Sequence, residues 1–206
     1  MRFRCIGTSM LTHEKNLLTQ GYSYIAGIDE VGRGPLAGPV TACALIMPPG
    51  LIIPGVTDSK ALSPQKREEL AHIIKEKATD YALGWADETT IDEINILQAT
   101  YLAMSRAIGN LRVPPDALLI DGPAGKWLPD IPSVFIKGGD VASHSIAAAS
   151  ILAKVARDAF MTALHAEYPE YGFDTHKGYG TRAHRAAILD HGPCPAHRRS
   201  FLSKVQ

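Results

Sequence analysis

Residues 27–40 read GIDEVGRGPLAGPV, and this stretch decides which fold the chain can have. Positions 32–37 fit the dinucleotide-binding pattern G-x-G-x-x-G/A, in which the glycines must open a helix whose N-terminus meets a pyrophosphate. Here Pro35 and Pro39 lie in the turn, and the following VTACALI (residues 40–46) is rich in strand-forming residues. We therefore expect the glycines to join two strands, which argues against a nicotinamide or flavin site.

Outward from this loop, the apolar runs and turn residues predict an α/β layered fold. Strands are expected at residues 24–28, 40–47, 81–86, 117–120 and 133–136. Helices are expected at residues 64–78, from a capping box of Thr90 and Glu93 to about residue 108, from Ser143 or Ser145 to residue 167, and at residues 181–190. The side chains expected to face inward on the two long helices are Ile94, Leu97, Tyr101, Met104 and Ile108, and then Ile146, Leu152, Val155, Phe160 and Leu164.

The length of 206 residues suits one domain with a substantial core. No internal repeat or low-complexity linker divides the chain. Residues 1–20 fit no regular element and are expected to form a loose N-terminal arm, so that a single domain spans residues 21–206. Its last part, from about residue 165 to residue 206, is expected to be a helical and basic extension.

The composition limits the possible partners and compartments. Lys plus Arg and Asp plus Glu number 21 each, so any site for nucleic acid or phosphate must be a local patch. No apolar run reaches the roughly 18 residues that a membrane helix needs. Cys5, Cys43 and Cys194 are scattered and lack metal-binding spacing, which indicates reduced thiols in a cytoplasmic protein.

Three of the predicted strands end in an aspartate: Asp29, Asp121 and Asp140. Asp121 before glycine is also a common turn residue, and Asp140 precedes a helix, where an acid favours the dipole. The pair Asp29-Glu30 is harder to explain by structure alone, because adjacent strand residues face opposite sides of a sheet. If these acids converge, two charges about 4 Å apart repel by roughly 4 kcal/mol at an effective dielectric of about 20. Such a site needs a divalent cation, and oxygen ligands suit Mg²⁺ or Mn²⁺ rather than Zn²⁺.

Five ordered motifs between about residues 24 and 201 resemble those of ribonuclease HII, the bacterial type 2 ribonuclease H. They are GIDEVGRGP (27–35), LIDG (119–122), KGGD (137–140) with SIAAASILAK (145–154), HKGYGT (176–181) and PAHRRSF (195–201). The resemblance implies a ribonuclease H-like fold, with a central mixed β-sheet flanked by helices and a helical C-terminal extension.

The resemblance also implies a catalytic site of four carboxylates that bind Mg²⁺ or Mn²⁺, namely Asp29, Glu30, Asp121 and Asp140. Enzymes of this family hydrolyse the RNA strand of RNA–DNA hybrids. They also nick duplex DNA on the 5′ side of single embedded ribonucleotides, and they leave 3′-hydroxyl and 5′-phosphate ends. The expected partners are therefore an RNA–DNA hybrid and ribonucleotide-containing duplex DNA, with no membrane and with the enzyme acting as a monomer.

By the same resemblance, Gly32-Arg33-Gly34 reads the ribose, since glycine lets the backbone approach the sugar and the 2′-hydroxyl distinguishes RNA from DNA. Tyr179 would pack its ring against the adjoining deoxyribose. The alternatives are a surface arginine in a turn for Arg33 and ordinary packing for Tyr179. Lys60 and Lys154 are weaker candidates for phosphate binding. Further basic residues that suggest a backbone-gripping surface are Lys177, Arg182, Arg185, Arg198, Arg199 and Lys204, with His176, His184, His191 and His197.

Two side-chain groups are expected to lie outside the site. Asp158 follows Lys154 by four residues on one helix, which indicates an ion pair rather than a fourth metal ligand. The histidines lack zinc spacing, and His72 and His165 are expected on helix surfaces. Two other functions remain open: a catalytically silent hybrid-binding module, and a DNA nuclease or strand-transfer enzyme with the same carboxylate chemistry.

Overall fold

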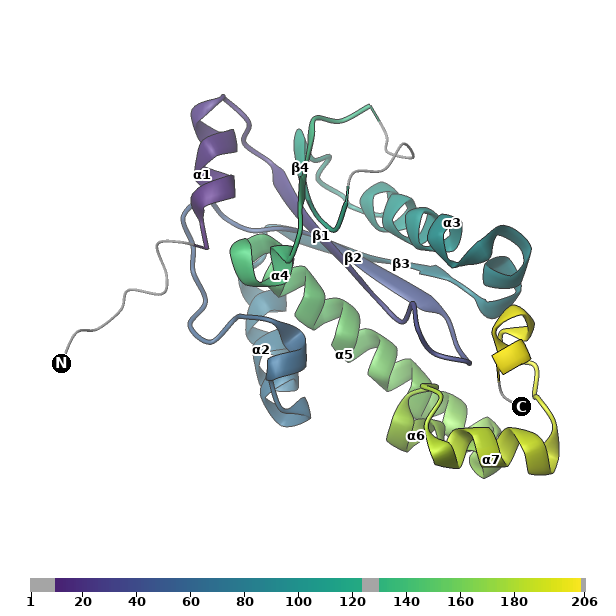
Figure 1. The fold of residues 1–206 in the computed structure, drawn as a ribbon. Helices are drawn as coiled ribbons and strands as arrows, with labels where there is room; N and C mark the ends of the chain where they lie inside the picture. The colour runs from purple at the N-terminus through teal and green to yellow at the C-terminus, as the bar shows by residue number, and fades with distance from the viewer. Residues whose placement is uncertain (1–9, 124–129, 205–206) are drawn as a thin grey trace.

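The computed structural model describes residues 10–123 and 130–204, and its centre is one mixed five-stranded sheet with helices on both faces (Figure 1). The strands are β1 (Ile25–Val31), β2 (Val40–Ile46), β3 (Asp80–Ala86), β4 (Ala117–Asp121) and β5 (Ser133–Ile136). Their order is β3-β2-β1-β4-β5. β1 pairs antiparallel with β2 and parallel with β4. Residues 32–39 therefore join two strands, as predicted, and these two strands run antiparallel.

The helices follow the strands in the predicted order and add several short elements. The α-helices are α1 (Thr12–Thr19), α2 (Pro64–Lys77), α3 (Glu88–Gly109), α4 (Gly139–Ala142), α5 (His144–Glu167), α6 (Phe173–His176) and α7 (Arg182–His191). The 3₁₀ turns are η2 (Ser59–Ala61), η3 (Pro169–Tyr171) and η4 (Arg199–Lys204). Within the described residues, no helix is long and apolar enough to cross a membrane.

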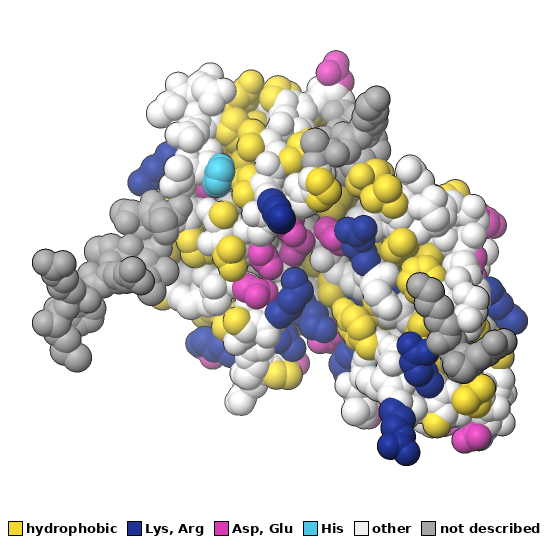
Figure 2. Space-filling view, in the orientation of Figure 1, with side chains coloured by type: hydrophobic (Ala, Val, Ile, Leu, Met, Phe, Trp, Pro, Cys, Tyr) yellow, Lys and Arg dark blue, Asp and Glu magenta, His cyan; other side chains and the backbone are white. Residues whose placement is uncertain are grey.

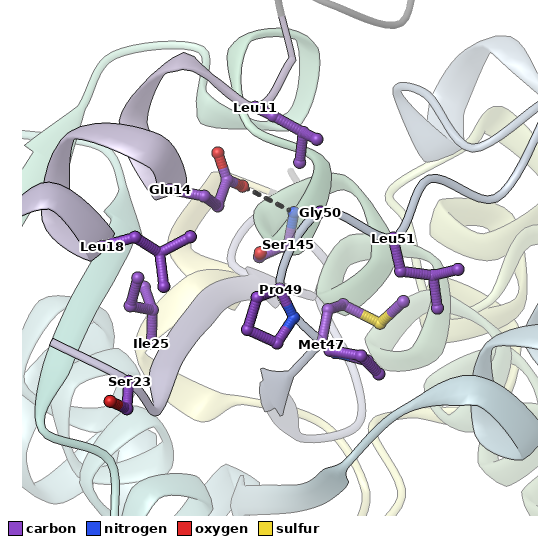
Figure 3. Close-up of a pocket in the computed structure, with 11 residues that line it drawn as sticks. Leu11, Glu14, Leu18, Ser23, Ile25, Met47, Pro49, Gly50, Leu51 and Ser145 are labelled. Carbon is purple, nitrogen blue, oxygen red and sulfur yellow. Dashed lines mark hydrogen bonds between the residues drawn. The ribbon is translucent and has the colours of Figure 1, made fainter.

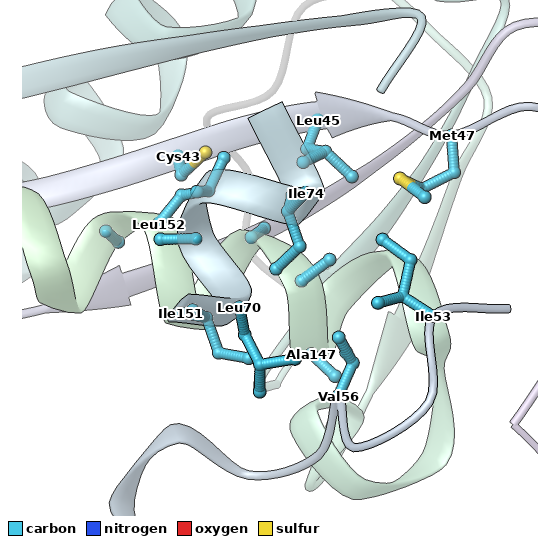
Figure 4. Packing of buried hydrophobic residues seen from close by; sticks show 14 of the residues in the cluster. Cys43, Leu45, Met47, Ile53, Val56, Leu70, Ile74, Ala147, Ile151 and Leu152 are labelled. Atoms are coloured by element: carbon cyan, nitrogen blue, oxygen red, sulfur yellow. The ribbon is translucent and has the colours of Figure 1, made fainter. Parts of the chain in front are cut away.

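The two faces of the sheet bury separate clusters, because strand side chains alternate between faces. On one face, Cys43 and Leu45 of β2 pack against Leu70 and Ile74 of α2 and against α5 (Figure 4). On the other face, residues of β1, β2 and β4 such as Ile28 pack against α3. Cys43 and Cys194 are free, buried thiols, whereas Cys5 lies outside the described residues.

The expectation of a loose arm over residues 1–20 is wrong for its second half, where α1 forms and packs against the domain. Leu11 and Leu17 are buried, and so is Glu14. One carboxylate oxygen of Glu14 accepts hydrogen bonds from the Ser143 hydroxyl at 2.7 Å and from the Ser145 N–H at 3.1 Å, in a small pocket at the start of α5 (Figure 3). No start signal precedes α1, since the residue before it is a leucine whose side chain makes no cap hydrogen bond.

Helix α3 begins differently from the prediction, and this changes which side chains it buries. Its N-cap is Asp87, whose carboxylate accepts from the N–H of Thr90, so the capping box of Thr90 and Glu93 is wrong. At Asn95 the backbone leaves the helical region (φ 66°), which breaks the periodicity. Ile94 and Leu97 are consequently exposed, at 36% and 42%, whereas Met104 and Ile108 are buried as predicted.

Helix α5 begins close to the predicted position, with the hydroxyl of Ser143 accepting from the N–H of Ile146. Ile146 and Leu152 are buried as predicted, and Val155 and Leu164 are partly buried. Phe160 is 42% exposed, against the prediction, because it lies over the edge of the sheet. Its ring lies 5.7 Å from the ring of Trp85 on the edge strand β3.

Candidate active site

Two adjacent acids lie inside strand β1. The strand runs on to Val31, so the expectation that Asp29 closes it is wrong; pairing with Cys43 and Ala42 of β2 keeps Asp29 and Glu30 in the ladder. Asp29 is only 6% exposed. Its carboxylate accepts from the N–H of Glu30 at 2.8 Å and interacts with the hydroxyl of Ser150 on α5. The two carboxyls thus leave the strand on opposite faces of the sheet.

The other two acids come from the neighbouring end of β4 and from α4. Asp121 is the last residue of β4, as predicted, and its carboxylate accepts from the N–H of Gly139 at 2.7 Å. Asp140 does not close a strand, because β5 ends at Ile136 and Gly138 (φ 70°) turns the chain into α4. The Nζ of Lys60 lies 3.7 Å from a carboxylate oxygen of Asp140.

Asp29, Glu30 and Asp140 have raised pKa values, and neighbouring carboxylates contribute to each rise. Burial raises the pKa of Asp29 well above its usual range, and the carboxylates of Glu30 and Asp121 raise it further. Burial also raises the pKa of Glu30, opposed by the guanidinium of Arg33, with Asp121 adding to the increase. The pKa of Asp140 is raised by burial and by Asp121, although Lys60 opposes this. Figure 2 shows Asp and Glu side chains gathered near the middle of one face, with Lys and Arg side chains beside them.

The chemistry of this cluster fits a hard divalent cation. All its donors are carboxylate oxygens, which suit Mg²⁺ or Mn²⁺. Burial raises the pKa values of Asp29, Glu30 and Asp140, and neighbouring carboxylates add to the rise, so a bound cation would favour their charged forms. Across residues 10–123 and 130–204, no three side chains of Asp, Glu, His or Cys are arranged to hold one ion together. Ligation by the four carboxylates therefore stays a prediction.

The loop of residues 32–39 follows the two acids of β1, and the buried side chain of Arg157 on α5 binds its carbonyls. This side chain is fully buried. Its guanidinium donates to the carbonyls of Pro39 at 2.9 Å, Lys177 at 3.0 Å and Ala37 at 3.2 Å. Gly32 (φ +90°) packs directly on it, since a Cβ at that position would lie 2.2 Å from Nε of Arg157.

A second buried arginine, Arg198, holds the same loop from the C-terminal side. It donates twice to the carbonyl of Gly38, at 2.8 and 2.7 Å, and also to those of Gly32 at 2.6 Å and Arg33 at 3.1 Å. Burial and the nearby guanidinium of Arg157 lower the pKa of Arg198 to about 9, which leaves it charged at neutral pH. The expectation that Arg198 belongs to a phosphate-gripping surface is therefore wrong, because its side chain has no access to solvent.

The structure brings Tyr179 beside the glycine loop. A Cβ on Gly34 would meet the Tyr179 ring at 3.8 Å, and the N–H of Leu36 donates to the carbonyl of Gly178 at 2.8 Å. The Tyr179 side chain is 40% exposed, with the guanidinium carbon of Arg157 6.0 Å from its ring centre. Arg33 lies 3.4 Å from the carboxylate of Glu30, which connects the loop to the acids. The loop thus contacts Glu30 through Arg33 and lies beside Tyr179 at Gly34.

Comparison with known proteins identifies this arrangement. The sequence model of the family Ribonuclease HII matches residues 26–204. The chain belongs to the ribonuclease HII family. It is 54% identical over 193 residues to the ribonuclease HII of Syntrophotalea carbinolica, covering 94% of this chain and 92% of that one. It is 52% identical over 194 residues to that of Caldicellulosiruptor saccharolyticus, covering 93% of both.

Solved structures agree with this assignment. The ribonuclease H2 from Pyrococcus horikoshii OT3 superposes with a TM-score of 0.73 at 26% identity, covering 88% of this chain and 96% of that one. The ribonuclease H-like fold, with its mixed sheet flanked by helices, is therefore confirmed. As a ribonuclease HII, the chain is a metal-dependent endonuclease that hydrolyses the RNA strand of RNA–DNA hybrids.

The two lysines predicted as weaker phosphate-binding candidates, Lys60 and Lys154, have different surroundings. Lys60 is 82% exposed and its pKa is raised, because Asp140 and Asp58 outweigh partial desolvation. The ammonium of Lys154 instead donates to Asp158 at 2.8 Å, which confirms the predicted ion pair along α5. A phosphate contact by Lys154 would have to compete with this pair.

The C-terminal basic surface expected for this ribonuclease HII is only partly exposed. Arg182 and Arg199 are exposed, whereas His184 and His197 are buried together beneath Tyr179. No local sequence pattern marked the buried arginines and histidines, since arginine and histidine usually reach solvent. The partners of the buried arginines are backbone carbonyls of distant segments, for instance residues 32–39 for Arg198. Sequence reasoning therefore assigned these side chains to a surface that they do not form.

Proposed function

We propose that this ribonuclease HII cleaves with Asp29, Glu30, Asp121 and Asp140 as its catalytic carboxylates, loaded with Mg²⁺ or Mn²⁺. The observation that supports this most is that the carboxylate of Asp121 on β4 adds to the raised pKa of Asp29 and Glu30 on β1 and of Asp140 on α4, although burial is the larger cause in each case. Bound divalent cations supply a water of lowered pKa as nucleophile and stabilise charge on the leaving oxygen.

The chain's own residues would orient the substrate and hold the charges in place. Asp121 is fixed by the N–H of Gly139, and Asp29 by the N–H of Glu30, so neither carboxylate swings freely. Lys60, exposed and next to Asp140, is available to a phosphate of the cleaved strand. Water would be supplied from solvent on the open side of the site.

Substrate selection is assigned to the loop and the tyrosine. Gly34 carries no side chain on the side of Tyr179, which leaves the backbone open to a ribose and its 2′-hydroxyl. The exposed ring of Tyr179 lies next to it and would pack on the following deoxyribose. This arrangement supports nicking on the 5′ side of a single ribonucleotide in duplex DNA, with 3′-hydroxyl and 5′-phosphate ends. We further expect a monomer in the cytoplasm.

The test uses a DNA duplex with one ribonucleotide beside an all-DNA duplex, each with Mg²⁺, Mn²⁺ or EDTA. Nicking that requires metal and occurs only 5′ of the ribonucleotide is the expected result. Equal cutting of both duplexes would contradict ribose reading by Gly32-Arg33-Gly34. An Asp121→Asn variant at saturating Mn²⁺ tests the carboxylates, and wild-type rates there would exclude Asp121 from the site.

A further inference from the structure

Beneath Tyr179 lies a buried chain of three side chains that the catalytic site does not use. His184 of α7 is fully buried, His197 is 2% exposed and Cys194 is 7% exposed. Nε2 of His184 and Nε2 of His197 are 3.0 Å apart. At one end, Nδ1 of His184 lies 3.0 Å from the carbonyl oxygen of Tyr179; at the other, Nδ1 of His197 lies 3.0 Å from the N–H of Cys194.

The contacts allow only one direction of hydrogen bonding. A carbonyl can only accept, so Nδ1 of His184 carries the proton that it donates to Tyr179. Burial lowers the pKa of His184 to about 4, so the ring is neutral at pH 7 and its Nε2 accepts. His197 must then donate from Nε2, which leaves its Nδ1 to accept.

The far end of the chain agrees with this assignment. The backbone N–H of Cys194 can only donate, and it points at Nδ1 of His197 at 3.0 Å. The thiol sulfur lies 3.1 Å from the same nitrogen. The carbonyl of Cys194 is also 3.3 Å from Nδ1, but a protonated Nδ1 would face the N–H donor. The backbone groups at the two ends therefore favour these two tautomers.

The segment at the Tyr179 end lacks regular structure and depends on such contacts. Lys177 (φ 53°) and Gly178 (φ 83°) are both left-handed, directly before the tyrosine. The carbonyl of Lys177 is held by Arg157, and that of Tyr179 by His184 together with the N–H of Thr181. The tyrosine ring itself stays 40% exposed, so its direction is set mainly through its backbone.

We propose that His184 and His197 are positioning residues, which form with Cys194 a one-way chain of hydrogen bonds that aims Tyr179 at the substrate. The proposal rests on the role assigned to Tyr179 under the proposed function. Neither histidine touches the substrate; each acts through the carbonyl of Tyr179. The group that holds the Tyr179 backbone is the Nδ1–H of His184.

A first experiment reads the tautomers directly in the wild-type protein. Long-range ¹H–¹⁵N correlation spectra at pH 7 report which ring nitrogen carries the proton. We expect the proton on Nδ1 in His184 and on Nε2 in His197. The opposite tautomers, or a charged ring at either position, would overturn the proposal without any activity measurement.

A second experiment uses two substitutions that each keep one half of the imidazole. His184→Asn can place an amide N–H near the position of Nδ1 and keep the bond to Tyr179, whereas His184→Gln reaches only the Nε2 position. The measured quantity is kcat/KM for nicking at a single ribonucleotide divided by kcat/KM on a continuous RNA–DNA hybrid. We expect this ratio to fall about tenfold in His184→Gln, the effect of one lost hydrogen bond, and to stay within about threefold in His184→Asn.

Controls separate positioning from stability and from the role of the tyrosine. Ile188→Val perturbs the same buried cluster on α7 and should leave the ratio unchanged. Tyr179→Ala should lower the ratio; an unchanged ratio would show that the role of Tyr179 is wrong and would remove the proposal with it. If Tyr179→Ala lowers the ratio but His184→Asn and His184→Gln have equal ratios, the role of Tyr179 stands and the positioning role of His184 is rejected. If His184→Gln does not fold, the tautomer spectra decide.

Discussion

Replacing Gly34 with alanine should impair ribose recognition while leaving the fold intact. The backbone of Gly34 is not left-handed, and the nearest atom to an added Cβ is the Tyr179 ring carbon at 3.8 Å, an ordinary van der Waals distance. The free energy of unfolding should therefore change by less than about 1 kcal/mol. In the complex, the methyl group would occupy the space through which the sugar approaches. A displacement of about 1 Å can reduce the rate about 100-fold, and we expect a loss of this size in kcat/KM.

Gly32→Ala is the matched control with the opposite behaviour. Its left-handed backbone (φ +90°) costs about 1–2 kcal/mol for alanine, and the Cβ would lie 2.2 Å from Nε of Arg157. Moving that guanidinium weakens hydrogen bonds to Pro39, Lys177 and Ala37, each worth about 1.5–3 kcal/mol for a charged donor. The free energy of unfolding should thus fall by about 3–5 kcal/mol.

Urea unfolding and nicking of a duplex with one ribonucleotide test both variants side by side. The reasoning predicts normal stability with poor nicking for Gly34→Ala, and poor stability for Gly32→Ala. A Gly34→Ala enzyme that nicks at the wild-type rate would refute close approach of the ribose at this glycine. Equal destabilisation of the two variants would refute the distinction drawn from their backbone angles.

Three further predictions concern charge. Asp121→Asn should lower metal-dependent cleavage by at least about 100-fold without lowering the Tm, because it removes one of several mutually repelling charges; cleavage assays and thermal melts check this. Arg198→Lys should reduce the free energy of unfolding in urea by about 2–4 kcal/mol, since an ammonium cannot replace a guanidinium that reaches three carbonyls. Acid should destabilise the protein between pH 6.5 and about 4, because burial, with a smaller effect of His176 and His197, lowers the pKa of folded His184, so that the unfolded ring binds a proton that the folded ring does not. The contribution is at most about 3 kcal/mol, and urea melts of His184→Asn should depend less on pH.

Local sequence patterns predicted most of the fold because strands and long helices carry their own signals. The five strands were found from short apolar runs bounded by glycine and proline. The end of β1 was placed too early because Asp29 and Glu30 are poor strand formers, whereas pairing with β2 holds them in the ladder. Helix α1 was missed because it has neither an N-cap side chain nor a wide apolar face; its stability comes from contacts such as that of Glu14 with the start of α5.

In the site, too, some residues could be predicted from the sequence and others could not. Asp121 could be placed at a strand end from sequence, and the motifs supplied the candidates Gly34 and Tyr179, which the fold then brought together. The buried side chains that hold these residues in place could not be predicted. Arg198 acts on carbonyls about 160 residues away, a separation for which no periodicity or spacing exists. The contacts of His197 join it to His184 of α7 and to the N–H of Cys194, and no sequence pattern marks them.

The buried side chains of Arg157 and Arg198 also bear on how a chain of zero net charge binds a nucleic acid. Arg157 and Arg198 draw the carbonyls of residues 32, 33 and 37–39 inward, which fixes the loop and satisfies its acceptors. The same two guanidiniums place positive charge beneath the surface where the substrate backbone is proposed to lie, in a medium that screens it less than water does. If the substrate backbone lies there, these two charges would add to its attraction without forming part of an exposed basic surface.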